Sequence, residues 1–381
     1  MFLKEKIVNY INDNAEKEFD PYYIYDSSVI KEHCRLFQNL SYENKAIHFA
    51  SMANINHDFL KIVKEEKVNV FVNSVIHLQA VQEVGYNHQE IIFTASALSE
   101  KKMIFAHNNG VQVNLDSPSQ LRLWSELFPG EPVGIRCNIG DKIKPYSTHA
   151  GFFIGKESRL GFTLEEIAAI QDKTIIKGLH IYVGTDIVDV DYFINCYKEL
   201  IGIASVFPNL EYLNFGGGFG VSENGERQFD FKEYDNRVTQ LMTDASLHCG
   251  KNLKLILEPG RIIGGDAGFF VCNVTDVKKR ENSFLVGLNA STVQFSRPLM
   301  YPDTAHHPVM IFRDGCQLFL QPIYTTDIYG CSTYSRDLFR RNVLLPEIKI
   351  GDIVVLGNAG SYSASSHSKF LGFPKPEEYF I

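Results

Sequence analysis

The sequence predicts an α/β protein with a closed (β/α)8 barrel of the TIM type and a C-terminal β-rich domain. Short apolar runs typical of buried strands alternate with helical segments through the first two thirds of the chain. About eight such repeats suit a closed barrel. Polar or glycine-rich motifs follow several of the runs, as expected where barrel strands end on one face. An open doubly wound sheet is the second possibility.

The elements are expected in the following order. After an amphipathic first helix, a short strand at 21–26 leads into a helix capped near Ser27 or Ser28. Helices are expected between the barrel strands, for example over 58–64, 76–83 and 100–107. The predicted barrel strands are 45–50, 68–72, 91–94, 111–115, 133–137, 176–182, 212–215 and 253–257.

The alternation stops near Gly268. Strand-like runs at 269–278, 283–287, 309–312 and 352–356 then follow without helices between them. We therefore expect a barrel domain over 25–268, and a β-rich domain made of 1–24 and 269–381 that completes the active site.

Composition narrows the function classes. The chain has 381 residues, 45% hydrophobic and 22% charged, with a net charge of −8 and no long basic run. Nucleic acid and anionic membranes are therefore not expected as partners. The first residues lack a signal peptide and no run has transmembrane length, so a cytoplasmic location is expected. The seven cysteines have no metal-ligand or disulfide spacing, and most are expected in the core.

Two motifs at predicted strand ends suggest a polar ligand. Gly216, Gly217 and Gly218 follow an apolar strand, and a turn without side chains can turn backbone N–H groups toward an anion such as a phosphate. A tight turn that needs positive φ is the alternative. The next strand ends in Glu258-Pro259-Gly260-Arg261, and a carboxylate and a guanidinium there suit a polar cofactor better than a core.

The order of these motifs carries a family resemblance. The glycine run, the segment 258–261, and the ending Gly360-Ser361-Tyr362-Ser363 with 370–374 together resemble the fold-type III pyridoxal-phosphate enzymes. Within that class, the chain is similar to the diaminopimelate, ornithine and arginine decarboxylases from about residue 20 to its C-terminus.

The resemblance implies a pyridoxal 5'-phosphate (PLP) site. The three glycines would hold the phosphate, helped by Arg261 and the Tyr362 hydroxyl. Glu258 would face the pyridine nitrogen and keep it protonated. A surface ion pair is the alternative for Glu258, and a packed aromatic is the alternative for Tyr362.

It also implies a substrate site and a homodimer. Arg297 and Tyr301 resemble the segment that meets the substrate carboxylate. Cys331 resembles a cysteine that enters the partner subunit's site and helps to protonate the intermediate. Asp337 is the first acidic residue after it and a candidate for substrate contact. A surface position for Arg297 and a core position for Cys331 remain open.

The chain departs from the family at two cofactor positions. Met52 in Phe49-Ala50-Ser51-Met52-Ala53-Asn54 stands where the family has its Schiff-base lysine, and a thioether cannot form an imine. Tyr182 stands where the family has a stacking histidine. His180 lies two residues before it and Thr185 three after, and all three are expected near the cofactor.

Several functions remain open. The first is PLP-dependent decarboxylation of an α-amino acid, either a basic diamino acid or a conjugated unit in siderophore or other secondary-metabolite synthesis. Met52 is then an engineered replacement or a natural departure. The second is a PLP- or metabolite-binding pseudoenzyme. Amino-acid racemisation ranks lower because it needs a base on each face. A metal-dependent hydrolase using His306 and His307 ranks last, and no metal is expected.

Overall fold

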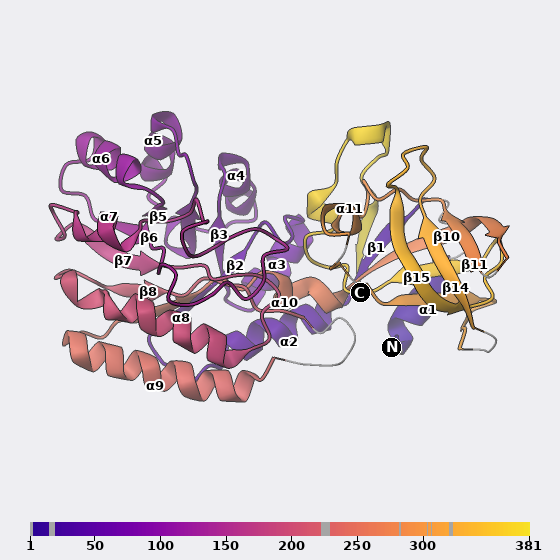
Figure 1. Ribbon diagram of the computed structural model, residues 1–381, viewed down its shortest axis with the longest axis horizontal. Helices are drawn as coiled ribbons and strands as arrows, with labels where there is room; N and C mark the ends of the chain where they lie inside the picture. The colour runs from indigo at the N-terminus through magenta and orange to yellow at the C-terminus, as the bar shows by residue number, and fades with distance from the viewer. Residues whose placement is uncertain are drawn as a thin grey trace. The chain divides into compact units, whose positions relative to one another are not determined.

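The computed structural model describes residues 3–14, 20–221, 229–281, 283–302, 304–305, 307–319 and 323–381. These residues form two compact units (Figure 1). The described parts of Lys31–Val221 and Arg227–Ile263 make the first unit, and those of Met1–Ile30 and Gly264–Ile381 belong to the second.

The first unit is a closed barrel of parallel strands, which confirms the predicted fold class and excludes the open sheet. Strand β9 pairs with β2, where Ile47 lies opposite Leu257, and this pairing closes the barrel. The strands are β2 Lys45–Ala50, β3 Asn69–Val72, β4 Ile91–Thr94, β5 Gln112–Leu115, β6 Val133–Arg136, β7 Ile176–His180, β8 Tyr212–Asn214 and β9 Lys254–Leu257.

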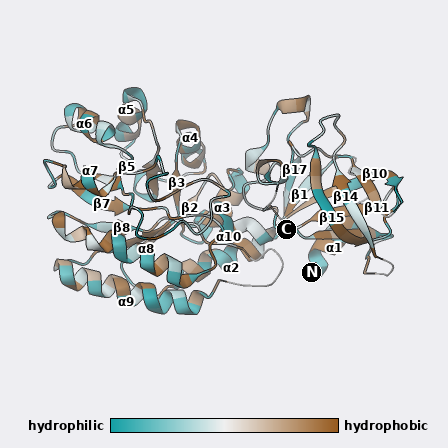
Figure 2. Cartoon of the chain, in the orientation of Figure 1, coloured by the Kyte–Doolittle hydropathy of each residue, from teal (hydrophilic) through white to brown (hydrophobic). Residues whose placement is uncertain are grey.

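Helices connect consecutive strands of the barrel (Figure 1). Side chains cap several of them, as the Ser74 hydroxyl does for α4 by accepting a hydrogen bond from the His77 amide. Strips of hydrophilic and hydrophobic residues alternate along α8 and α9 (Figure 2). None of the described helices combines the length and hydropathy needed to cross a membrane. The helices are α2 Ser27–Gln38, α3 His57–Glu65, α4 Val75–Glu83, α5 Glu100–Asn108, α6 Pro118–Leu127, α7 Leu164–Ala168, α8 Val190–Gly202, α9 Phe231–Cys249 and α10 Arg261–Gly264.

The Tyr212 ring fills part of the barrel interior. A Cβ on Gly178 of β7 would lie 1.7 Å from the Cζ atom of this ring, so position 178 must be glycine to leave room for the ring. The Tyr212 hydroxyl donates to Oδ1 of Asn114 at 2.6 Å, and Nδ2 of Asn114 donates to Oγ1 of Thr94 at 3.1 Å. The interior is therefore packed rather than open, and the polar atoms of Tyr212, Asn114 and Thr94 are hydrogen-bonded within it.

The second unit is built on a sheet in the order β13-β12-β16-β10-β11-β14-β15, and β1 pairs with both β10 and β17. Helix α1 (Glu5–Asn14) packs through Ile7 and Ile11 into the hydrophobic core of this sheet, which includes Val355. The strands are β1 Tyr22–Tyr25, β10 Gly268–Lys279, β11 Ser283–Leu288, β12 Val309–Arg313, β13 Cys316–Gln317, β14 Ile323–Tyr329, β15 Leu338–Pro346, β16 Ile353–Leu356 and β17 Glu377–Phe380.

Candidate functional site

Three neighbouring barrel strands end in buried polar side chains. His180 is the last residue of β7, Asn214 is the last of β8, and Glu258 directly follows β9. In the parallel register His180 lies beside Asn214, and Asn214 lies beside Ile256, two residues before Glu258. Because the carboxyl ends of the strands share one face of a barrel, these side chains form one polar cluster.

Glu258 is the charged centre of this cluster, and only 4% of it is exposed. Nδ2 of Asn214 donates to its Oε1 atom at 2.6 Å, and Nε2 of His180 lies 3.3 Å from its Oε2 atom. Burial acts to raise the pKa of Glu258, but His180 and the Asn214 amide together hold that pKa below its ordinary value. Glu258 is therefore an ionised carboxylate at neutral pH.

His48 adds a neutral imidazole from β2, the strand on the other side of β9. Its Nδ1 atom lies 3.2 Å from the carbonyl oxygen of Val70. Burial lowers the pKa of His48 to about 4, although this hydrogen bond and the Glu258 charge act to raise it. The sequence reasoning did not identify His48, because only barrel closure brings β2 and β9 together.

Close packing requires glycine in the loop Gly216–Gly218. A Cβ on these residues would lie between 2.2 and 2.4 Å from a backbone oxygen, that of Ile181, Glu258 or Gly184 respectively. Such contacts force a substituted residue to move. Gly216 and Gly218 also have φ values of +66° and +104°, so the alternative of a turn that needs positive φ is sufficient to explain these two glycines.

The same loop still offers hydrogen-bond donors. The amide N–H groups of Gly217 and Gly218 have no hydrogen-bond partner within the described part of the chain. The Gly216 amide instead donates to Oδ1 of Asn214 at 2.9 Å, which joins the loop to the Glu258 cluster. Two backbone donors close to an ionised carboxylate suit a ligand that carries both an anion and a proton donor.

Asp186, an acid that the sequence reasoning missed, connects Arg261 to this loop. The Arg261 Nε atom is 2.6 Å from Oδ1 of Asp186, and 3% of the Arg261 side chain is exposed. Asp186 belongs to the loop after β7, where the Ile187 amide donates to the carbonyl oxygen of Gly218 at 2.9 Å. In the predicted phosphate contact, the Arg261 guanidinium would therefore bind the phosphate and Asp186 at the same time.

Strand β7 is shorter than predicted and ends at His180, so Tyr182 lies in the following loop. The Tyr182 ring is half-buried and meets the Phe153 ring edge-on, with centroids 4.9 Å apart. Thr185 lies in the same loop, next to Gly184, whose carbonyl oxygen packs on Gly218. Thr185 therefore lies close to the glycine loop in space, and His180, at the end of β7, contacts Glu258.

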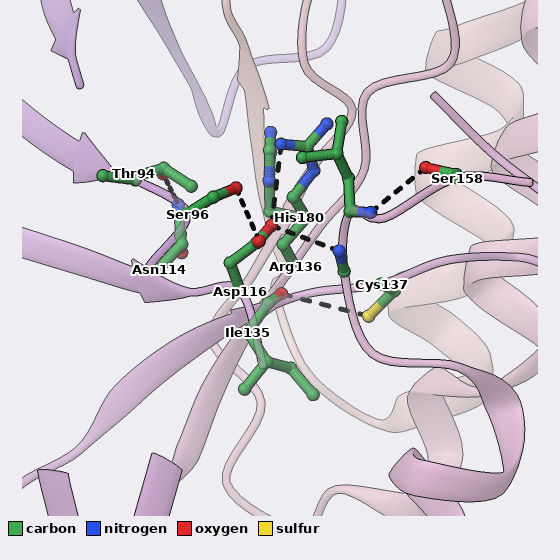
Figure 3. A network of polar contacts seen from close by, with 12 residues as sticks. Thr94, Ser96, Asn114, Asp116, Ile135, Arg136, Cys137, Ser158 and His180 are labelled. Atoms are coloured by element: carbon green, nitrogen blue, oxygen red, sulfur yellow. Dashed lines mark hydrogen bonds and ion pairs between the residues drawn. The ribbon is translucent and has the colours of Figure 1, made fainter. Parts of the chain in front are cut away.

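A second buried carboxylate, also missed from the sequence, lies at the ends of β4, β5 and β6 (Figure 3). The Oδ2 atom of Asp116 accepts a hydrogen bond of 2.6 Å from the Ser96 hydroxyl, and its Oδ1 atom accepts one of 3.1 Å from the Gly161 amide. The Arg136 guanidinium lies 3.7 Å from Oδ1. Burial lowers the pKa of Arg136, while Asp116 and then Glu258 act to raise it. Arg136 thus links the two carboxylates electrostatically.

Met52 lies in the turn that follows β2, and its side chain is half-buried. The Ala50 amide donates to the carbonyl oxygen of Pro259 at 3.0 Å, and the Ser51 amide donates to that of Phe71 at the same distance. The turn is therefore attached to the segment just after Glu258. No hydrogen bond or ion pair joins a lysine to Glu258 among the described residues.

The β-rich unit brings Arg297 and Tyr301 together. Arg297 begins α11 (Arg297–Met300), and 5% of it is exposed. Its guanidinium carbon lies 5.5 Å from the centroid of the Tyr301 ring, a cation–π geometry. The alternative of a surface position for Arg297 is therefore wrong.

Cys331 and Asp337 belong to one loop between β14 and β15. Cys331 is exposed, so a core position is wrong for it. Partial burial, with the Asp337 charge, raises the pKa of the Cys331 thiol, which stays protonated at neutral pH. Asp337 is buried and accepts four hydrogen bonds, two from Thr292 and two from Ser332. Its carboxylate therefore holds the loop together.

Tyr362 is half-buried and has a φ of +55°, in the left-handed region that aromatic residues rarely adopt. Such backbone strain often accompanies a functional position.

Of the histidine pair considered for a metal, His306 lies outside the described residues. His307 is buried, with Nδ1 2.8 Å from the carbonyl oxygen of Gly357. No cluster of three metal-ligand side chains occurs in the part of the chain described.

Comparison with known proteins decides the family. Residues 27–265, more than half of the chain, match the family described as pyridoxal-dependent decarboxylase, pyridoxal binding domain. The chain belongs to this decarboxylase family. The diaminopimelate decarboxylase of Methanothermobacter thermautotrophicus is 29% identical to this chain, over 96% of it and 88% of that protein. That of Escherichia coli K12 is 26% identical, over 94% and 88%.

Solved structures of decarboxylases share the fold. A diaminopimelate decarboxylase crystal structure has a TM-score of 0.89 at 24% identity, covering 98% of this chain and 91% of that chain. The Helicobacter pylori diaminopimelate decarboxylase complexed with L-lysine has a TM-score of 0.86 at 22% identity, covering 97% and 93%. The Paramecium bursaria Chlorella virus arginine decarboxylase bound to agmatine has a TM-score of 0.82 at 21% identity, covering 99% and 100%.

The cofactor of the decarboxylase family is PLP, and the barrel residues fit its non-covalent contacts. Two backbone donors at Gly217 and Gly218 suit a phosphate. The ionised Glu258 has accepted one short hydrogen bond and one longer contact, so lone pairs remain for a protonated ring nitrogen. The Met52 thioether, unlike a lysine amine, cannot form an imine with an aldehyde.

Proposed function

We propose that this protein is a PLP-dependent decarboxylase of an α-amino acid, either a basic diamino acid or a conjugated amino acid in a biosynthetic assembly pathway. The observation that carries the proposal is the buried, ionised Glu258 beside the free amides of Gly217 and Gly218. The names of the relatives, diaminopimelate and arginine decarboxylases, support the substrate class.

The cofactor contacts follow from chemistry already present in the barrel. Bound PLP supplies an electron-accepting ring for the charge left by the departing CO₂. Glu258 keeps a proton at the pyridine nitrogen, since its own proton affinity is low. Gly217 and Gly218 would donate to the phosphate, with Arg261, Thr185 and Tyr362 as further contacts. His180 holds the Glu258 carboxylate in place, and Tyr182 would contact the ring.

The substrate contacts are proposed for the β-rich unit. Arg297 binds a substrate carboxylate, oriented by its contact with Tyr301. The Cys331 thiol carries a proton at neutral pH and so can deliver it to the substrate carbon. Asp337 acts on substrate only through Cys331, because its own oxygens are occupied by Thr292 and Ser332.

Met52 is the unusual residue of the proposed site, because the family has a lysine at this position. With a thioether at this position, the barrel residues would hold PLP only through its phosphate and ring, so the cofactor would exchange with solution. A pseudoenzyme that binds PLP without turnover is the alternative, and racemisation remains below both. Homodimerisation, a cytoplasmic location and the domain limits at residues 25 and 268 are proposed with the function. Sedimentation of the full chain tests the dimer.

The test compares the wild type with Met52→Lys, with Met52→Leu as the matched apolar control. The lysine variant is expected to gain a visible imine absorbance, a borohydride-fixable PLP adduct and CO₂ release from diamino acids. The wild type and Met52→Leu should bind PLP reversibly, with no fixable adduct. If none of the three proteins retains PLP at saturating cofactor, the assignment of Glu258 and the glycine loop is wrong.

A further inference from the structure

A cavity of about 700 Å³ lies within the β-rich unit, between α11 and β15. Helix α11 contributes Pro298 and Leu299 to its wall, and β15 contributes four consecutive residues, 338–341. Pro302, Ala305 and Arg336 complete the described lining. The volume lies within the range of small-molecule sites, which extends from about 300 to about 1,000 Å³.

Two irregularities in β15 explain why consecutive residues line one cavity. A regular strand presents only every second side chain to one face. Here Thr326 lies opposite Val343 and Ile328 opposite Arg340, so Arg341 and Asn342 together face the single residue Asp327. A bulge of this kind turns a side chain away from its regular direction.

The bulge is stabilised locally. Asn342 has a φ of +51°, and its amide donates to Oδ1 of Asp327 at 2.8 Å. A second shift, between Ile328 and Tyr329, leaves Phe339 as an extra residue on β15. As a result Arg340 and Arg341 both line the cavity, whereas a regular strand would direct them to opposite faces.

The charged side chains in the described lining of the cavity are all positive. Arg336, Arg340 and Arg341 line it, and no aspartate or glutamate belongs to its described lining. Arg336 and Arg341 are exposed and form no ion pair with any carboxylate in the described part of the chain. The nearest acid in sequence, Asp337, is buried and bonded to Thr292 and Ser332, so it does not neutralise them.

We propose that this cavity, formed by residues 298–299, 302, 305, 336 and 338–341, binds a small organic anion. Guanidinium groups suit carboxylate and phosphate oxygens, which they bind through paired N–H donors. The proline, leucine and phenylalanine side chains of the lining suit a hydrocarbon skeleton. The ligand class is therefore a carboxylate or phosphate ester with an apolar part. The site uses none of the residues assigned above to the cofactor or the substrate.

The experiment measures binding of phenyl phosphate to the full chain by calorimetry and ligand-observed NMR. Benzoate tests whether a carboxylate suffices, inorganic phosphate tests the need for an apolar part, and benzyl alcohol tests the need for charge. We expect saturable binding of phenyl phosphate that weakens with salt, weaker binding of inorganic phosphate, and none of benzyl alcohol.

Three variants identify the site. Arg336→Gln with Arg341→Gln should reduce phenyl phosphate affinity by at least about tenfold. Asp327→Ala, which removes the acceptor of the bulge amide, should also reduce this affinity, although all three arginines remain in the sequence. Arg280→Gln removes an exposed arginine of the same unit outside the cavity and should change nothing. The double arginine variant binding as tightly as the wild type would overturn the proposal, as would the absence of saturable binding.

Discussion

Two buried carboxylates, Glu258 in the barrel and Asp337 in the β-rich unit, have opposite surroundings. They are 4% and 3% exposed. Asp337 accepts four hydrogen bonds from Thr292 and Ser332, backbone and hydroxyl from each. Glu258 accepts one at 2.6 Å from Asn214 and has a 3.3 Å contact with His180.

The difference lies in acceptor capacity. An ionised carboxylate has about four lone-pair positions, so Asp337 is saturated and Glu258 is not. A saturated carboxylate stabilises its loop and has nothing left for a ligand. An unsaturated one that remains ionised in a buried cluster can bind one. Burial alone therefore does not separate structural from functional acids, whereas counting the acceptors does.

The largest expected effect is the loss of Asp337. Replacement by asparagine puts an amide NH₂ where an oxygen meets the Ser332 amide and hydroxyl. We expect a loss of about 3 kcal/mol or more in the free energy of unfolding, measured with urea. Asp314→Asn, at an exposed turn of the same unit, should stay within about 0.5 kcal/mol. A loss below about 1 kcal/mol for Asp337→Asn would show that the four hydrogen bonds to Asp337 contribute little to stability.

The next largest effect is a loss of stability in acid, which should come from the surroundings of Glu258 because the buried histidines His48 and His180 lie near it. The folded-state pKa of His48 is about 4, below its ordinary 6.5, so protons bind preferentially to the unfolded chain. Neutral His48 therefore contributes up to about 3 kcal/mol to the free energy of unfolding. This contribution is complete above the ordinary pKa of histidine and is lost as the pH falls toward the folded-state pKa. His48→Asn should flatten the pH dependence of the urea midpoint. An unchanged slope would mean that His48 is already charged in the native barrel.

The smallest expected effect is the most specific. Glu258→Gln removes the charge but keeps the shape, and should weaken PLP binding by about 2 kcal/mol, roughly 30-fold. Its free energy of unfolding should change by less than about 1 kcal/mol, since no saturated network is broken. Absorbance titration with PLP measures the first and urea unfolding the second. If stability falls as far as in Asp337→Asn, Glu258 is a structural acid as well.

Much of the fold could be predicted from local patterns. The alternation of strand and helix periodicity between residues 45 and 257 predicted a closed barrel ahead of an open sheet, and its disappearance after Gly268 predicted the β-rich region. The pairing of β9 with β2 decided for the barrel. Strand ends were less certain, and β7 ends at His180 rather than at Tyr182. His180, the last residue of β7, contacts Glu258, and Tyr182 lies in the loop that follows the strand.

The candidate site was only partly predictable. Glu258 and the glycine loop stood out because a polar or glycine motif directly follows an apolar strand. His48, Asp116 and Arg136 did not, since each is an ordinary polar residue within or after a strand. Their importance depends on neighbours that lie on other strands, and those become adjacent only when the barrel closes.

Local sequence was enough to establish the periodicity, and hence a parallel sheet covered by helices, along with the chemistry of single positions such as the Met52 thioether. Tertiary structure decided the partners: His180 and Asn214 for Glu258, Asp186 for Arg261, and a saturated network for Asp337. It also decided the direction of Arg341, through a bulge visible only when β14 and β15 pair. The physical reason is that periodicity depends on neighbours along the chain, whereas proton affinity and acceptor capacity depend on neighbours in space.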